Sequence, residues 1–271
     1  MVIEKAYAKI NLALEVMDIK DGYHMVNNLM VPIDLYDELS FEHANDITLV
    51  NNEYEDNIIL KAARLFINKF NIKSGVKITI NKKIPSEAGL GGGSSDAAAT
   101  LRGLNKLFKL DLDNKVLLDL AASLGSDVPF FIQSKLALCT NRGEVVNIID
   151  KSYKPINILL LKPKTGCKTK EVYENYHYEG ISKSNLINNI IDDLGNNDID
   201  SIQNHIFNDL LNPALKTNPE LKEIYDDLKQ KTNIYLSGSG STLFIIEPTL
   251  KTKQYINDKY QDLYQFKTKI I

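Results

Sequence analysis

The sequence predicts an α+β protein of two domains, and three features support this prediction. Residues 6–16 alternate apolar and polar side chains as a β-strand does, whereas residues 97–108 repeat apolar side chains at helical spacing. Segments of both kinds are mixed along the whole chain. A polar stretch at residues 150–156 precedes a new apolar segment, so we place the domain boundary there, with domains at residues 1–152 and 153–271.

The first domain is expected to begin with a strand that leads into a turn. Ile10, Leu12 and Leu14 share one face of this strand because side chains alternate along a strand. The sequence DGYH at residues 21–24 then interrupts the pattern as a turn, and the apolar stretch at residues 29–42 suggests further strands.

Apolar spacing, capping residues and glycines predict the other elements. Pro129 disfavours helical geometry at Val128, so we expect the chain to leave the turn at Asp127 as a strand. The remaining expectations for the first domain are a helix capped by Asp56 or Asn57, a strand at 75–84, a helix capped by Ser94 or Ser95, and a helix at 113–124 that ends at Gly125. Those for the second domain are strands at 157–163, 233–236 and 242–246 and helices at 185–195, 200–211 and 219–231.

Composition points to a cytoplasmic protein that handles a small molecule. A net charge of −3 and a pI near 5.9 give no general attraction to nucleic acid. The N-terminal sequence lacks the pattern of a signal peptide, and no apolar run approaches the length of a membrane span. Cys139 and Cys167 have no metal-ligand spacing and are typical of core residues in a reducing cytosol. We therefore expect no nucleic-acid or membrane partner, and either a monomer or a homodimer.

The sequence PSEAGLGGGSSD at residues 85–96 predicts a phosphate-binding loop. Glycines before a helix let several backbone N–H groups turn toward one anion, and the helix N-terminus carries partial positive charge. A tight turn into the helix would explain one or two glycines but not four. The run is neither a Walker A loop, because no lysine follows it, nor G-x-G-x-x-G, because Ser94 replaces the last glycine. Asp96 would repel a phosphate unless it points away or Mg²⁺ lies between them.

Four ordered segments together resemble the GHMP kinase superfamily. They are AYAKINLALEV with DGYH, PSEAGLGGGSSDAAATL, LGSDVPFF and LSGSGSTLF, and they extend from about residue 5 to residue 247. The glycine loop carries the likeness to the superfamily, whereas A-K-I-N-L paired with D-G-Y-H resembles its branch that acts on a cytidyl substrate. The resemblance implies the two-domain GHMP kinase fold, with the active site in the cleft between the domains.

The resemblance also implies catalytic roles for two residues whose own sequence patterns do not mark them as catalytic. Lys9 on a strand is ordinarily a solvated residue, and Asp127 is ordinarily a turn aspartate. By resemblance Asp127 lies next to the acceptor hydroxyl, orients it and accepts its proton late, while Lys9 holds Asp127 and offsets phosphoryl charge. The residues that the resemblance assigns to substrate binding are Asn11, Tyr23, His24, Tyr173, Gly238, Ser239 and Gly240.

The implied activity is ATP- and Mg²⁺-dependent phosphorylation of the C2 hydroxyl of a cytidyl substrate in non-mevalonate isoprenoid precursor synthesis. Two alternatives remain. The protein could be another small-molecule kinase of the superfamily, of the mevalonate or homoserine type, or a non-catalytic ligand-binding member. Ser241 stands where the family commonly has proline and Asn141 where it has glycine, which affects loop geometry rather than catalytic groups. No residue is assigned as a metal ligand. The implied ATP contacts are Asn57, Pro85, Ser86, Glu87, Ala88, Gly89, Leu90, Gly91, Gly92, Gly93, Ser94 and Ser95.

Overall fold

The computed structural model of the chain describes residues 1–51, 57–178 and 180–271. Eleven strands of these residues form one sheet, with the order β3-β4-β2-β11-β7-β10-β9 along its main path. The strands are β1 (Val2–Lys20), β2 (Tyr23–Ala44), β3 (Thr48–Val50), β4 (Gly75–Asn81), β5 (Ala137–Thr140), β6 (Val145–Ile148), β7 (Ile156–Lys162), β8 (Phe207–Asn208), β9 (Tyr235–Leu236), β10 (Leu243–Ile246) and β11 (Tyr264–Ile270).

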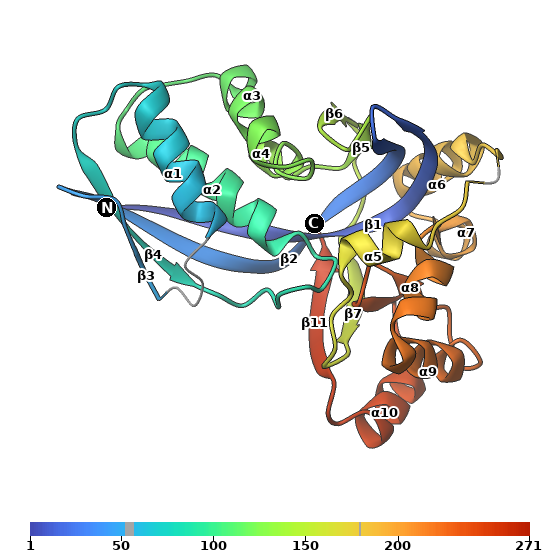
Figure 1. Cartoon of the computed structure of the whole chain (residues 1–271). Coiled ribbons are helices and arrows are strands. Elements are labelled where there is room, and N and C mark those ends of the chain that lie inside the picture. Colours follow the sequence, from blue (N-terminus) through green and yellow to red (C-terminus); the bar gives the residue numbers. More distant parts are fainter. Residues whose placement is uncertain (52–56, 179) are drawn as a thin grey trace.

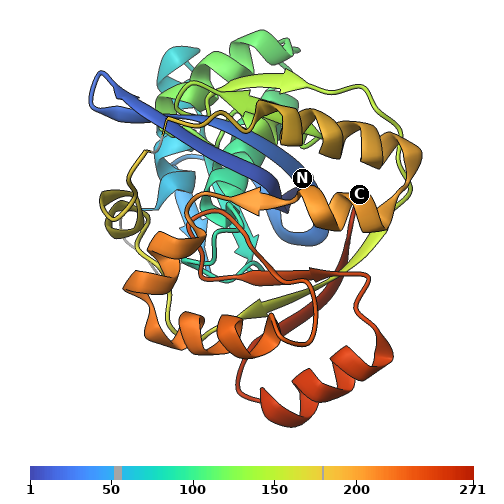
Figure 2. The ribbon, with the colours of Figure 1, turned by 90° about the vertical axis from the view of Figure 1, so that its right-hand side faces the viewer.

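The helices cover the sheet in two groups, one at each end of the molecule (Figures 1 and 2). Helices α1 to α4 pack near the long antiparallel β1–β2 hairpin, and α8 to α10 lie near β7 and β11. In the described part of the chain, no helix combines the length and the apolar composition that a membrane crossing requires. The helices are α1 (Ile58–Lys69), α2 (Gly92–Leu107), α3 (Asn114–Leu124), α4 (Phe130–Gln133), α5 (Thr169–Glu174), α6 (Ser184–Asn196), α7 (Ile199–His205), α8 (Leu211–Thr217), α9 (Pro219–Leu228) and α10 (Leu250–Lys259).

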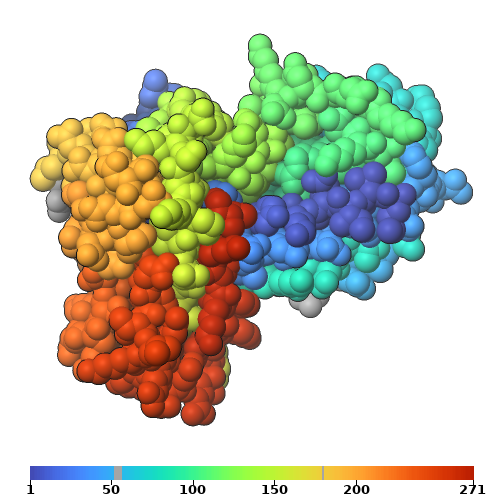
Figure 3. Space-filling view, turned by 180° about the vertical axis from the view of Figure 1, so that it is seen from behind, coloured from blue at the N-terminus to red at the C-terminus, as the bar shows by residue number. Residues whose placement is uncertain are grey.

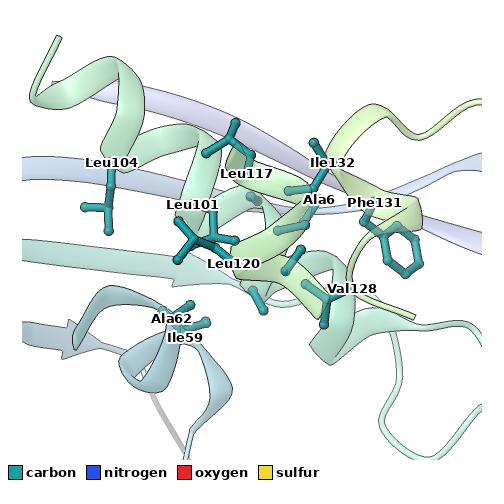
Figure 4. Close-up of a cluster of buried hydrophobic side chains, with 14 of the residues drawn as sticks. Ala6, Ile59, Ala62, Leu101, Leu104, Leu117, Leu120, Val128, Phe131 and Ile132 are labelled. Carbon is teal, nitrogen blue, oxygen red and sulfur yellow. The ribbon is translucent and has the colours of Figure 1, made fainter. Parts of the chain in front are cut away.

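Strand β1 is buried on both faces rather than on one. Every residue from Ala8 to Val16 is buried, because three hydrophobic clusters meet along this strand. In the first cluster Ala6 of β1 packs with the apolar faces of the neighbouring helices, as in Figure 4. Burial on both faces explains how a lysine and an asparagine of this strand can lie inside the protein.

The two halves of the chain share the sheet. Strand β11 pairs with β7 along its whole length and also with β2, through Ile270 opposite Ile33. Figure 3 shows the N-terminal residues, blue to green, meeting the C-terminal ones along the yellow-green and red segments that include β7 and β11. The predicted boundary at residues 152 and 153 falls in the connection between β6 and β7, and the division into two domains stays a prediction.

Several expectations about the elements were wrong in ways that have a physical reason. Neither Ser94 nor Ser95 caps α2, because Gly91 takes that position in left-handed geometry with φ +71°. Pro129 precedes the short helix α4 and not a strand, since proline fits the start of a helix well. The helix expected at 200–211 ends at His205 and gives way to β8 and α8.

Other expectations were confirmed. Asn57 caps α1 by accepting a hydrogen bond from the Ile59 backbone, whereas Asp56, the alternative cap, lies outside the described residues. The helix ending at Gly125 begins after the cap Asp113, although Gly125 is extended rather than left-handed. Elements that the sequence analysis did not anticipate are β3, α4, β5, β6, α5, β8, α8, α10 and β11.

Candidate active site

A cavity of about 1440 Å³ is lined by residues from both predicted domains. It brings together the glycine loop, the Lys9 and Asp127 side chains, and the rings of Tyr23, His24 and Tyr173. Of all the site residues expected from the sequence, Ser95 alone is absent from the cavity wall. Segments far apart in the chain therefore converge on one cavity.

Packing accounts for two of the four glycines in the loop. Gly89 and Gly91 have φ of +72° and +71°, a conformation that costs other residues energy. A Cβ on Gly89 would come 2.1 Å from the Ser237 carbonyl oxygen, and one on Gly91 would come 2.5 Å from the Phe131 ring. Gly93 has no such reason, because its Cβ would meet nothing closer than 3.8 Å. Gly93 lines the cavity, as bare backbone for a phosphate would.

The two serines after the glycines have different positions. Ser94 lines the cavity in the first turn of α2. Ser95 is buried, and its hydroxyl donates a hydrogen bond of 2.7 Å to the Tyr7 carbonyl oxygen. The expected contact of Ser95 with ATP therefore has no support in its side-chain position, which instead fastens α2 to β1.

A lysine that the sequence analysis missed lies beside the glycine loop. Lys82 follows β4, lines the cavity, and donates to Asp37 (2.6 Å) and to Asp96 (2.8 Å). Its pKa is raised because the attraction of Asp96 and Asp37 outweighs the opposing effect of burial. Asp37 also accepts from the backbone of Lys83 and Ile84, so this group fixes the segment that enters the loop.

Asp96 is held by Lys82 and does not confront a phosphate as a free charge. Burial raises its pKa to about 7, with Asp37 adding to the rise and Lys82 opposing it. One carboxylate oxygen of Asp96, Oδ1, is buried and has no hydrogen-bond partner among the described residues. The pairing with Lys82 resolves the conflict that the sequence raised between this carboxylate and an anionic ligand.

Lys9 is buried and oriented by neighbours on the same face of the hairpin. Its Nζ donates to Asn11 Oδ1 at 2.7 Å, and Asn11 Nδ2 donates to Asn28 Oδ1 at 2.5 Å. Burial lowers the pKa of Lys9, while the negative charge of Asp127 partly offsets that effect. Asn28, which also lines the cavity, is a second residue that the sequence analysis missed.

Asp127 lies half-buried in the turn between α3 and α4. Among the described residues it forms no ion pair with Lys9, so Lys9 does not hold it directly as the resemblance suggested. The lysine instead bonds to Asn11, two residues away on the same face of the strand. Lys9 and Asp127 both line the cavity, and the negative charge of Asp127 acts on the pKa of Lys9 without an ion pair between them.

Three aromatic residues also line the cavity, namely Tyr23, His24 and Tyr173. The rings of His24 and Tyr173 have centroids 5.5 Å apart, and His24 Nδ1 lies 3.2 Å from the Met17 carbonyl oxygen. Burial raises the pKa of Tyr173, so it remains a neutral phenol. Tyr23 is 57% exposed. Tyr173 comes from α5, a helix that the sequence did not reveal, and still reaches the ring of His24.

The segment 238–240 packs against the glycine loop. Ser237 donates to the Gly89 carbonyl oxygen at 2.9 Å, and the Thr242 N–H donates to the Ala88 carbonyl oxygen at 3.1 Å. A Cβ on Gly238 would lie 3.2 Å from Lys9 Nζ. The left-handed Gly238, with φ +57°, thus lets this segment approach both the phosphate loop and Lys9.

Comparisons with known proteins agree with this geometry. The family "GHMP kinases N terminal domain" matches residues 57–135, and "GHMP kinases C terminal" matches residues 190–257. The 4-diphosphocytidyl-2-C-methyl-D-erythritol kinase of Clostridium perfringens is 38% identical over 97% of each chain. That of Prochlorococcus marinus is 39% identical over 93% of this chain and 87% of the relative.

Solved structures show the same relationship. A crystal structure of 4-(cytidine 5'-diphospho)-2C-methyl-D-erythritol kinase has a TM-score of 0.84 at 29% identity, covering 99% of this chain and 98% of its own. Homoserine kinase from Cytophaga hutchinsonii, at 16% identity, a TM-score of 0.72 and coverage of 100% and 94%, shares the fold. The chain belongs to the GHMP kinase superfamily and, within it, to the family of 4-diphosphocytidyl-2-C-methyl-D-erythritol kinases.

Proposed function

We propose that this protein transfers a phosphoryl group from ATP to the C2 hydroxyl of 4-diphosphocytidyl-2-C-methyl-D-erythritol, in non-mevalonate isoprenoid precursor biosynthesis. One observation carries the proposal. One cavity, lined by residues of both predicted domains, joins the glycine loop, Lys9 with Asp127, and the aromatic residues Tyr23, His24 and Tyr173. The names of the full-length relatives support the same substrate.

The chemistry follows from the positions of Asp127 and Lys9. Phosphoryl transfer has a loose transition state in which the attacking oxygen keeps its proton until late. Asp127, which has no competing ion pair among the described residues, is free to orient the hydroxyl and take that proton. Lys9, fixed by Asn11 at 2.7 Å, offsets charge on the transferring group in a buried site where electrostatic effects are strong.

ATP is proposed to lie with its phosphates at the start of α2. The N-terminal turn of a helix has unsatisfied N–H groups and favours anions, and Gly92, Gly93 and Ser94 of that turn line the cavity. Asn57 also lines the cavity, and we propose that it contacts adenine.

Magnesium is proposed to enter with ATP. Among the described residues, no three His, Cys, Asp or Glu side chains form a cluster suited to a metal. Mg²⁺ commonly takes only one or two protein ligands besides phosphate oxygens and water. The Ser94 hydroxyl and the Glu87 carboxylate, both in the cavity wall, fit that requirement. When bound, the ion would neutralise phosphate charge.

A substrate panel tests the proposal directly. We expect phosphorylation of the cytidyl substrate and none of mevalonate or homoserine, because a flat base can stack on Tyr23 and the other two substrates have no such face. Stacking of a base on an aromatic ring is worth about 1–3 kcal/mol, so Tyr23→Ala should raise the KM for the cytidyl substrate roughly 5- to 150-fold. The KM for ATP should change little in this variant.

The same panel separates the alternatives. Turnover of mevalonate or homoserine, with no binding of CMP at millimolar concentration, would assign the protein to another small-molecule GHMP kinase activity. Tight binding of ATP and CMP without turnover of any of the three substrates would indicate a non-catalytic ligand-binding member.

A further inference from the structure

An arginine that the reaction scheme leaves without a role lies in the cavity wall. Arg142 is in the turn between β5 and β6 and lines the cavity. The turn is anchored to β2, because the Val26 N–H donates a hydrogen bond of 2.6 Å to the Asn141 carbonyl oxygen. It is also closed on itself, from the Gly143 N–H to the Thr140 carbonyl oxygen at 3.0 Å. Arg142 is thus presented by a fixed turn.

Only part of the Arg142 guanidinium is engaged in contacts. It lies 5.0 Å from the centroid of the Tyr23 ring, and its Nε is 3.6 Å from Glu144 Oε1. Among the described residues, nothing hydrogen-bonds its two terminal nitrogens. Glu144 is not part of the cavity wall. A planar guanidinium whose two terminal nitrogens have no hydrogen-bond partner among the described residues, on a residue of the cavity wall, suits bidentate binding of a phosphate.

The turn touches both ends of the proposed substrate site. On one side Arg142 covers a face of Tyr23, the ring proposed to stack on the cytosine. On the other side the position of a Cβ on Gly143 lies 3.7 Å from Asp127 Oδ1, at the proposed reaction centre. In a cytidyl diphosphate ester the two phosphates join the base-bearing half of the molecule to the half that carries the accepting hydroxyl. A cation on this turn therefore lies where the diphosphate must pass.

Two of the other cavity cations are already engaged elsewhere. Lys9 is buried at the reaction centre, and Lys82 is committed to two carboxylates beside the glycine loop. Three further lysines line the cavity. Lys83 lies in the segment before the glycine loop, Lys162 is the last residue of β7, and Lys164 follows that strand.

We propose that Arg142 binds the diphosphate of the cytidyl substrate and, through its contact with Tyr23, joins the base site to the phosphate site. This inference rests on the proposed function. It assigns to Arg142 the discrimination between a cytidine diphosphate and the uncharged nucleoside, which stacking on Tyr23 alone does not provide.

The test compares the binding of CDP and of cytidine to Arg142→Gln by calorimetry. Hydrogen bonds to charged groups contribute about 1.5–3 kcal/mol, and a half-exposed guanidinium belongs at the lower end. Arg142→Gln should therefore weaken CDP binding by about 10-fold or more and cytidine binding by less than about 3-fold. The KM for the cytidyl substrate should rise with the Kd for CDP, and the KM for ATP should stay unchanged.

Lys20→Gln is the matched control. Lys20 pairs with Tyr23 in the β1–β2 register, is exposed, and does not line the cavity. Its loss changes the net charge near Tyr23 by the same amount as Arg142→Gln and should leave CDP binding within 2-fold of the wild type. Raising the salt concentration should weaken CDP binding to the wild type more than to Arg142→Gln, because the contact is partly exposed to solvent.

Each result decides between distinct outcomes. An unchanged affinity of Arg142→Gln for CDP, or an equal loss for CDP and cytidine, would overturn the inference while leaving the kinase activity in place. If Lys20→Gln weakened CDP binding as much as Arg142→Gln does, Arg142 would act only through its general positive charge, and the inference would also be overturned. If the wild type binds neither CDP nor cytidine, the proposed function fails, and the inference fails with it.

Discussion

Replacing Gly91 by alanine tests how the glycine loop is held in place. The φ of +71° at Gly91 would cost an alanine about 1–2 kcal/mol. The added Cβ would also come 2.5 Å from the buried Phe131 ring, and overpacking of this kind costs about 1–3 kcal/mol. The free energy of unfolding should therefore fall by about 2–5 kcal/mol, which lowers the Tm by roughly 4–20 °C for a domain of about this size.

The assay is thermal unfolding followed by circular dichroism, with Gly93→Ala as the control. Gly93 belongs to the same loop, but its Cβ would meet nothing closer than 3.8 Å. It lies in the first turn of α2, where alanine is the better helix former. The Tm of Gly93→Ala should stay within about 4 °C of the wild type. Equal melting temperatures for the two variants would refute the argument from φ and close approach.

Three further predictions concern charges in the cavity. Asp127→Asn should lower kcat by roughly 100-fold, near the lower limit for general acid–base catalysis, with both KM values little changed; a kcat near that of the wild type would exclude a catalytic role. Because burial lowers the pKa of Lys9, the pH profile of kcat should fall on its alkaline side below pH 10.5, and an alkaline limb at or above that value would contradict a role for the charged lysine. The pKa of Asp96 is raised from 3.8 to about 7 in the folded protein, so the folded state holds the extra proton and stability falls as the pH rises from about 4 to about 7. In Asp96→Asn this decrease in stability should disappear, which is measured by comparing the Tm at pH 5 with the Tm at pH 8. An unchanged pH dependence of the Tm would contradict the assignment of the decrease to Asp96.

The residues expected to bind or act on the substrates could be found because short motifs carry the family resemblance. Lys9 with Asn11, the turn before Tyr23 and the glycine loop each occupy one short segment, and the structure brings these segments to one cavity. What the segments could not show is the partner of each side chain. Lys9 bonds to Asn11, two residues along its own strand, rather than to Asp127.

Residues joined only by the fold were missed for the same reason. Lys82 and Asp37 lie 45 positions apart and meet through the pairing of β2 with β4. Arg142 reaches Tyr23 through the turn that β5 and β6 form beside β2. Neither pair has a spacing or motif that indicates a contact, so neither contact could be predicted from a single segment of the sequence.

The sequence by itself determined the superfamily, the phosphate loop and the types of side chain that the chemistry needs. It could do so because the glycine run, the helix start and the DGYH turn each lie within one short segment, and the resemblance rests on those segments. The tertiary structure alone decided that Asp96 is paired with Lys82, that Gly89 and Gly91 are required by the approach of Ser237 and Phe131, and that Arg142 faces the cavity. Those outcomes depend on which distant strands pair and on what they bury, and burial and partner distance are properties of the folded chain.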